Sequence, residues 1–242
     1  MISPAVAYQK NMKERPDMRK DAYKYFFEKY FKDPFVDKGF LDTIERIKGK
    51  SIRQFIPGKV YTFRYDPVYK DLLDYYDKRP IILCCGEWIA ESTGNRIVTG
   101  INFNFLPEIA RVNTLEYYYR SVKGDLDQAY KITSETDHVS FIKRALIVLQ
   151  DIVQSFNIFN KTGQIGYQFA MRNYIVGEHM SQNVIVEYDD WEWIPFVQTK
   201  DVVGKPLGQI YKEYLLERKA LAKKQPPILK AEEKRKYNNR RG

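Results

Sequence analysis

Few of the side chains that usually carry catalysis or bind metal ions occur in this chain. Its two histidines are His138 and His179, and neither lies at a metal-site spacing such as HExxH or in a Cys/His cluster. A single histidine is more often a structural residue than a ligand. The two cysteines, Cys84 and Cys85, are adjacent within an apolar stretch. Such cysteines are usually small buried side chains, so we expect neither a disulfide nor a nucleophile.

Carboxylates form two clusters that could serve a nuclease or a glycosidase, because those enzymes work largely with Asp and Glu. The clusters are Asp71, Asp74 and Asp77, and Glu187, Asp189, Asp190 and Glu192. Neither contains the Glu/Asp-x-Lys arrangement that is common in metal-dependent nucleases, and Glu187 and Glu192 flank a turn, where acidic residues are ordinarily solvated. The chain also lacks a Walker loop, a dinucleotide fingerprint and a GxSxG motif. We therefore expect no enzyme activity, no catalytic residues, no metal ligands and no cofactor.

Aromatic and basic residues lie close together in one stretch of the chain. Within 19 residues are Tyr61, Phe63, Arg64, Tyr65, Tyr69, Lys70, Tyr75, Tyr76, Lys78 and Arg79. Aromatic rings beside Arg and Lys are typical of surfaces that bind single-stranded nucleic acid or DNA ends. We take Arg64, Lys78 and Arg79 as candidate DNA- or partner-binding residues. The alternative is a β-rich core whose tyrosines keep their hydroxyl groups at the surface.

The C-terminal segment carries nearly all of the net charge of +9. Its last 25 residues hold ten basic and two acidic side chains, and the rest of the chain is close to neutral. A basic segment usually meets a polyanion, such as nucleic acid, an anionic membrane or an acidic protein surface; the alternative is a solubilising tail. The candidate DNA- or partner-binding residues here are Lys219, Lys223, Lys224, Lys230, Lys234, Arg235, Lys236, Arg240 and Arg241.

The composition of the chain predicts a folded domain, whose helices and strands would position these residues. Of the 242 residues, 44% are apolar and 15% are aromatic, which excludes a disordered protein and supplies a sizeable core. No apolar run approaches the roughly 20 residues that span a bilayer, and residues 1–20 lack the apolar region of a secretory signal. We therefore expect no membrane partner, and the adjacent, unpaired cysteines predict folding in a reducing compartment.

Apolar periodicity predicts the helices. Residues 18–33 form an amphipathic helix, whose aromatic stripe should dock on the protein's own body or on a neighbouring subunit. Residues 1–15 are expected to be extended. Further helices are predicted at 41–48, 107–120, 136–156, 167–176 and 207–221.

Alternating strand formers predict five strands, at 60–65, 81–88, 96–105, 184–188 and 191–197. The second and third of these strands form a β-hairpin. In the first strand, Tyr61, Phe63 and Tyr65 share one face, which should be buried against the helices, and Thr62 and Arg64 share the other.

These elements predict an α+β fold. We expect a small, twisted, mainly antiparallel sheet or partly open barrel of about five strands, with a helical insertion and helical N- and C-terminal extensions. The predicted organisation is an N-terminal helical extension at 1–50, an α+β core domain at 51–200, and a C-terminal helix with a basic tail at 201–242.

Four motifs give the chain a family resemblance. They are PGKVYTFRYDP at 57–67, YYDKRP at 75–80, GINFNFLP at 100–107 followed by Arg111, and DDWEWIPF at 189–196. Together they resemble a family of tailed-phage virion proteins, many of which are labelled by similarity to the DNA end-protector protein of T-even-type phages. The resemblance covers roughly residues 55–200, and it leaves out the N-terminal helix and the basic tail.

This resemblance implies a non-enzymatic structural protein of the phage head–tail region that contacts packaged DNA or protects its ends. The alternative is a neck or tail ring subunit that makes only protein–protein contacts. Expected partners are other virion proteins, such as portal, neck or tail subunits, with double-stranded DNA as a further candidate and a homo-oligomer in the particle. The expected location is the virion, after synthesis in the host cytoplasm.

Overall fold

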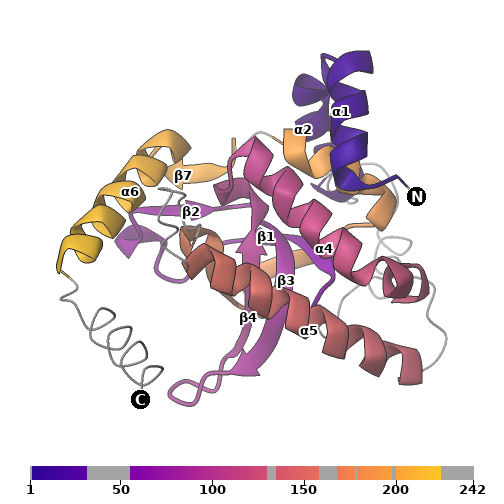
Figure 1. Ribbon diagram of the computed structural model, residues 1–242. Coiled ribbons are helices and arrows are strands. Elements are labelled where there is room, and N and C mark those ends of the chain that lie inside the picture. Colours follow the sequence, from indigo (N-terminus) through magenta and orange to yellow (C-terminus); the bar gives the residue numbers. More distant parts are fainter. Residues whose placement is uncertain are drawn as a thin grey trace, which may run out of the picture. The chain divides into compact units, whose positions relative to one another are not determined.

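The computed structural model describes residues 2–31, 55–129, 135–157, 168–177, 179–197 and 200–224 (Figure 1). The chain divides into two compact units, residues 1–204 and residues 205–242. The second unit contains helix α6, Leu207–Lys224, and all the other described elements belong to the first. Within the described ranges, no helix is long and apolar enough to cross a membrane. The three-part organisation expected from the sequence stays a prediction.

A five-stranded antiparallel sheet forms the centre of the first unit. Its strand order is β5-β4-β3-β1-β6, so β5 and β6 are its two edges. Every neighbouring pair is antiparallel, and the predicted α+β fold is confirmed. The strands are β1 (Val60–Tyr65), β3 (Ile81–Ile89), β4 (Arg96–Asn102), β5 (Met171–Ile175) and β6 (Met180–Ile185).

Strand β1 is buried on both faces along most of its length. Tyr61 and Phe63 are fully buried and Tyr65 nearly so, as the alternation predicts. Their cluster among the described residues consists of Phe55 and residues of the sheet itself, and not of the helices that we expected to cover this face. On the opposite face Thr62 is buried too, which leaves Arg64 as the exposed side chain of the strand.

Helices α4 (Glu108–Ala129) and α5 (Glu135–Asn157) pack against each other and cross in front of the sheet in Figure 1. The turn that precedes β1 lies against both of them. Its Gly58 has a φ of +87°, and a Cβ atom there would collide with the Tyr118 hydroxyl of α4 and come within 2.5 Å of the Ala145 Cβ of α5. The turn therefore needs glycine for its backbone angle and for its space.

The N-terminal residues form a helix and not the extended segment that we expected. Helix α1 spans Pro4–Glu14, with Pro at its first turn and the Ser3 hydroxyl accepting a hydrogen bond from the Val6 N–H at 3.4 Å. Both features favour a helix start. Helix α2 (Met18–Phe26) follows and continues as a π-helical turn, Phe27–Phe31. The predicted helix end near 33 and the predicted helix at 41–48 lie outside the described residues.

Two further predictions are wrong, and the position of a third predicted element is displaced along the chain. The expected helix at 167–176 is a 3₁₀ turn, Gln168–Ala170, followed by the edge strand β5. The expected strand at 191–197 belongs to a 3₁₀ segment, η5, which spans Tyr188–Phe196. Most side chains of η5 are buried whichever way they point, so apolar alternation does not identify its conformation. The expected strand at 184–188 is displaced as well, since β6 ends at Ile185.

A separate two-stranded sheet positions the candidate site. Strand β2 (Tyr75–Asp77) pairs antiparallel with β7 (Val202–Gly204), and a 3₁₀ turn, η2 (Lys70–Leu72), lies in the connection between β1 and β2. The sequence did not indicate this pairing, because its two short strands lie more than 120 residues apart. It brings Asp201, which directly precedes β7, beside the end of β2.

A candidate nucleic-acid interface

A pocket of about 630 Å³ lies where β1, β2 and their connections meet. Its lining comes from the end of β1, the β1–β2 connection, β2, the β2–β3 connection and the residue before β7. The lining residues are Arg64, Tyr65, Asp66, Lys70, Tyr76, Lys78, Arg79 and Asp201. All three body residues that the sequence singled out for DNA or partner binding, Arg64, Lys78 and Arg79, therefore face one cavity.

The pocket carries an excess of positive charge, four cations against two carboxylates. Asp66 lies 3.3 Å from the Lys70 ammonium group, and Asp201 lies 4.0 Å from Arg79. Arg64 and Lys78 differ from these two, because in the described part of the chain neither has a carboxylate within ion-pair distance. Their charges are available to an anion.

The two tyrosine side chains of the pocket differ in solvent exposure. Tyr65 is nearly inaccessible, its ring contacts Phe63 and Tyr174 edge to face, and its hydroxyl accepts a hydrogen bond from the Ile175 N–H at 3.3 Å. It forms a fixed wall. Tyr76 is only half-buried, so its ring can serve as a surface on which a base stacks. Together with the cations, this arrangement suits a nucleotide or a phosphate.

A buried carboxylate supports the connection that carries Lys78 and Arg79. Asp77 is 3% exposed, and one of its oxygens accepts hydrogen bonds from the side-chain amides of Asn102 and Asn104, both at 2.9 Å. Its other oxygen accepts the Arg79 N–H at 3.0 Å. Burial raises the pKa of Asp77, although these three donors oppose the shift. Asp77 therefore positions the turn and is no solvated member of an acidic cluster.

The backbone of the same turn is fixed from three further directions. Asn104 donates to the Arg79 carbonyl at 3.0 Å, the Lys78 N–H donates to the Asp201 carbonyl at 3.1 Å, and the Lys78 carbonyl accepts from the Tyr65 N–H at 2.9 Å. The motifs YYDKRP and GINFNFLP thus act as one unit. The first places the two cations, and the second holds them in place.

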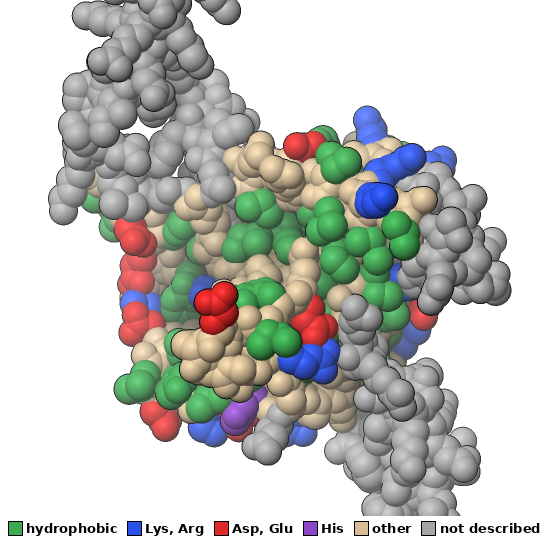
Figure 2. Space-filling model, turned by 90° about the horizontal axis from the view of Figure 1, so that it is seen from below, with side chains coloured by type: hydrophobic (Ala, Val, Ile, Leu, Met, Phe, Trp, Pro, Cys, Tyr) green, Lys and Arg blue, Asp and Glu red, His purple; other side chains and the backbone are tan. Residues whose placement is uncertain are grey.

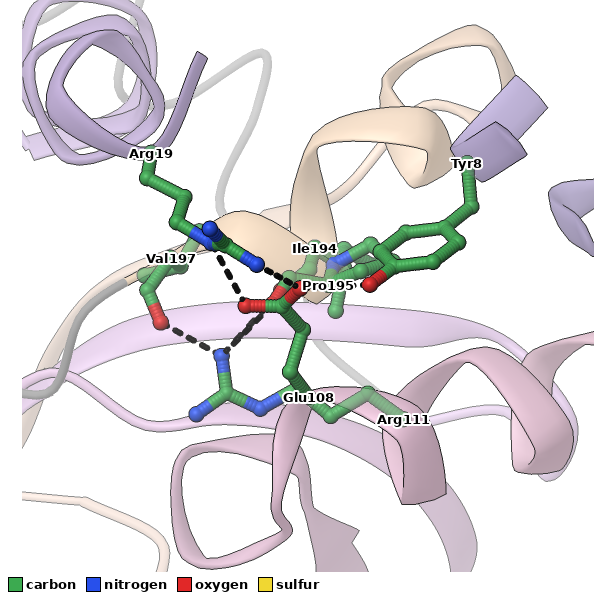
Figure 3. Close-up of polar contacts among 7 residues, drawn as sticks. All are labelled: Tyr8, Arg19, Glu108, Arg111, Ile194, Pro195 and Val197. Atoms are coloured by element: carbon green, nitrogen blue, oxygen red, sulfur yellow. Dashed lines mark hydrogen bonds and ion pairs between the residues drawn. The ribbon is translucent and has the colours of Figure 1, made fainter. Parts of the chain in front are cut away.

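Arg111, which follows the GINFNFLP motif, connects the start of α4 to η5 (Figure 3). It is 5% exposed, and its Nε donates to the Leu106 carbonyl at 2.8 Å. Its Nη1 donates to the carbonyls of Ile194 and Pro195, each at 3.3 Å, and of Val197. Burial lowers the pKa of Arg111 to about 10, so it still carries its charge at neutral pH. Its role is structural.

Glu108 binds the N-terminal helices to the same region (Figure 3). Arg19 forms a two-pronged contact with its carboxylate, at 2.8 and 3.0 Å, and the Tyr8 hydroxyl donates to it at 2.6 Å. Burial would raise the pKa of Glu108, but the hydrogen bonds from Arg19 and Tyr8 and the charge of Arg19 hold it below its ordinary value.

Of the two docking partners predicted for the aromatic stripe, the protein's own body and a neighbouring subunit, the structure shows the first. Ala22 and Phe26 of the stripe are fully buried, and the adjacent Tyr25 also contacts the body. The Tyr25 ring stacks on Trp193 with centroids 4.4 Å apart. Asp190 is buried, and it accepts hydrogen bonds from the hydroxyls of Tyr25, at 2.5 Å, and Tyr30, and from the Lys29 ammonium group at 2.5 Å. Asp190, a member of the second carboxylate cluster in the sequence, therefore anchors the N-terminal segment.

The structure also describes most of the cysteine and histidine residues that the sequence analysis considered for catalysis or metal binding. Burial raises the pKa of Cys85 to about 12 and that of Cys84 still further, so neither thiol ionises at neutral pH. His179 is half-buried and supplies a backbone carbonyl to the Asp66 N–H, whereas the side chain of His138 lies outside the described residues. Throughout the described ranges, no three His, Cys, Asp or Glu side chains are grouped so that they could hold a metal ion.

Most of the basic tail lies beyond the part of the chain that the structure describes. Lys219 is exposed on α6, and residues 225–242 lie outside the described residues, as do the side chains of Lys223 and Lys224. The sequence also missed part of the pocket. Lys70 and Tyr76 belong to the aromatic–basic stretch but were not singled out, and no sequence signal indicates Asp201, because only the β2–β7 pairing brings it there.

Comparison with known proteins places the chain in a family. Searches of the curated proteins and of the solved structures find no match. The sequence model of one family, described as Phage T4 terminal DNA protecting protein, matches residues 17–139, just over half of the chain. The matched region includes Arg64, Asp77, Lys78, Arg79 and Arg111 and ends before η5. The match covers the motifs at 57–67, 75–80 and 100–107 but not the one at 189–196, and it includes helix α2, which the resemblance was expected to leave out. It confirms the family resemblance, and the chain belongs to the Phage T4 terminal DNA protecting protein family.

Proposed function

We propose that this protein is a non-enzymatic virion protein of a bacteriophage that binds the ends of the packaged DNA in the head–tail region and shields them. The observation that carries the proposal is the pocket, which gathers Arg64, Lys70, Lys78 and Arg79 inside the region that matches the family. The description of that family supplies the substrate, the terminus of a DNA molecule.

To shield a DNA end, the protein has to stay bound to it and does not need to catalyse a reaction. The body outside the last 25 residues is close to neutral, so it has little general attraction for the side of a duplex. The excess positive charge of the pocket can instead attract a phosphate group at that one place on the surface. The basic tail adds phosphate contacts that do not depend on sequence and that weaken with salt. The proposed division is that the tail supplies affinity and the pocket supplies preference for an end.

Exonuclease protection tests this function. Linear duplex DNA incubated with the full-length protein should resist a general exonuclease, and a circular duplex of the same sequence should compete poorly for the protein. A triple variant with Arg64, Lys78 and Arg79 changed to Ala should lose the protection. Lys143→Ala, which removes an exposed lysine of α5 outside the pocket, is the matched control. If the wild-type protein leaves linear DNA unprotected and does not distinguish it from circles, the proposal is wrong.

The absence of enzyme activity is part of this proposal and has its own test. The purified protein should not degrade DNA in the presence of Mg²⁺ or Mn²⁺. Degradation that requires either ion and is abolished by Asp189→Asn or Glu192→Gln would show that the protein is a nuclease.

A neck or tail ring subunit that contacts only proteins is the second candidate function. Exposed apolar side chains favour it: Val139, Leu146 and Ile147 lie on α5 with between 43% and 63% of their surface accessible. Figure 2 shows one face of the molecule on which apolar side chains gather with charges of both signs among them. This candidate predicts a closed homo-oligomeric ring beside the portal in a map of the virion, and no binding to DNA ends.

A further inference from the structure

We propose that the pocket binds a phosphorylated strand terminus, meaning the last nucleotide of one DNA strand together with its terminal phosphate monoester. The site would therefore read the chemical end of a strand and not the side of a duplex. This inference rests on the proposed function and specifies what the pocket recognises.

The shape of the site favours a strand end. The pocket is concave and measures about 630 Å³, which lies within the range of about 300–1,000 Å³ that is usual for small-ligand sites. The side of a duplex is a convex surface, and proteins normally read it with elements that protrude into its grooves. A terminal nucleotide can leave the stack and enter a pocket, at an unstacking cost that is lower for an unpaired nucleotide than for a paired one.

The charges of the site favour a phosphate monoester. A terminal phosphate carries a charge of about −1.5 to −2 at pH 7, whereas each phosphate inside a strand carries a single negative charge. Arg64 and Lys78 have no carboxylate at ion-pair distance among the described residues. The planar guanidinium group of Arg64 can donate two hydrogen bonds to one phosphate, and Lys78 can add a point charge.

The remaining lining residues limit the ligand to one nucleotide. Asp66 and Asp201 line the same cavity, so a strand that ran through it would bring a second phosphate towards them. Asp66 lies beside Lys70, and Asp201 lies beside Arg79 and the Tyr23 hydroxyl, so a second phosphate would meet these carboxylates where they line the cavity. The half-buried ring of Tyr76 offers the base of that nucleotide a stacking surface.

Duplexes that differ only at their ends test this inference. The probes are fluorescent linear duplexes with a short 5′ overhang that ends in a phosphate or in a hydroxyl, a matching pair with 3′ overhangs, and the same duplex closed by hairpins. Binding of the full-length protein is measured by anisotropy. A phosphorylated terminus should bind at least about tenfold more tightly than the hydroxyl terminus, the gain expected for an added charge-assisted contact. The 5′ and 3′ pairs identify which end the pocket takes.

Variants of the lining residues test whether the preference for a phosphorylated terminus comes from the pocket. Arg64→Ala and Lys78→Ala should each reduce the ratio between phosphate and hydroxyl ends towards one, and Tyr76→Ser should weaken binding of the phosphorylated terminus about fivefold or more. Lys143→Ala should keep the wild-type ratio, and circular dichroism establishes that each variant is folded.

Two results would overturn the inference, and they are distinguishable. If the protein prefers open ends to hairpin-closed ends but binds phosphate and hydroxyl termini equally, the strand-terminus inference is wrong and the proposed function survives. If open and closed duplexes bind equally, the proposed function fails and takes this inference with it.

Discussion

Replacing Phe63 with Ala tests the assignment of the buried face of β1. Phe63 is fully buried, and its ring lies among those of Phe55, Tyr65 and Tyr174, with centroids 6.1, 6.3 and 5.1 Å away. Removing a buried phenyl ring costs about 3–5 kcal/mol. Three stiff aromatic neighbours cannot collapse into the space, so we expect the upper part of that range, about 4–5 kcal/mol. In a unit of this size each kcal/mol lowers the melting temperature by about 2–4 °C, which gives a loss of about 8–20 °C.

The assay is thermal and urea denaturation of the full-length protein, followed by circular dichroism. Arg64→Ala is the matched control because Arg64 is the next residue of the same strand and is exposed. It should change the free energy of unfolding by no more than about 0.5 kcal/mol. A Phe63→Ala variant that melts within about 2 °C of the wild type would refute the assignment of the inward face.

Three other perturbations have defined outcomes. Arg111→Ala removes a hydrogen-bond donor from four backbone carbonyls and should lower the free energy of unfolding by at least about 3 kcal/mol in urea denaturation; a loss below about 1 kcal/mol would contradict the structural role of Arg111. The raised folded-state pKa of Asp77 means that its protonation favours folding. The stability of the wild type relative to Asp77→Asn should therefore be greatest in acid and fall as pH rises through that pKa, and urea denaturation that shows the opposite trend is inconsistent with the burial. Deleting residues 226–242 should leave the circular dichroism spectrum unchanged and remove most of the DNA affinity, together with a log–log salt slope of about −5 if the tail engages about six phosphates; equal binding before and after deletion excludes that role.

Local patterns predicted the elements whose surroundings are regular. Strand β1 matches the predicted range, and the β3–β4 hairpin pairs as expected. Strand β4 ends at Asn102, three residues earlier than predicted, because the Asn102 side chain accepts a hydrogen bond from the Asn104 N–H and starts a 3₁₀ turn. Helix α4 starts near the predicted residue and continues to Ala129.

Elements stabilised by distant contacts could not be predicted in this way. Helix α1 has little apolar periodicity of its own. Its Ala5 N–H donates to Glu116 at 2.9 Å, and its Tyr8 contacts Glu108, both about 100 residues away. Strand β5 exists because it pairs with β4, which the sequence of residues 167–176 does not reveal.

The sequence indicated the basic residues of the site, but it did not indicate the residues that hold them in place. Arg64, Lys78 and Arg79 stood out because basic and aromatic residues cluster there, and the fold brings all three to one pocket. In the sequence Asp77 is a member of a candidate carboxylate cluster, and only the folded structure shows the two asparagines that donate hydrogen bonds to it. No property of the sequence near Asp201 indicates its position beside Arg79.

Gly58 has a consequence for the evolution of this family. Any other residue at this turn would have to adopt a strained backbone and displace side chains of two helices. Random substitution of this codon, followed by selection for folded protein, should therefore return glycine alone. Among homologues, the position becomes a marker of packing: a relative that carries another residue here must have smaller side chains on α4 and α5 beside this turn, or a wider spacing between the turn and the two helices. Alignments anchored on this glycine can thus identify the members that share this close contact.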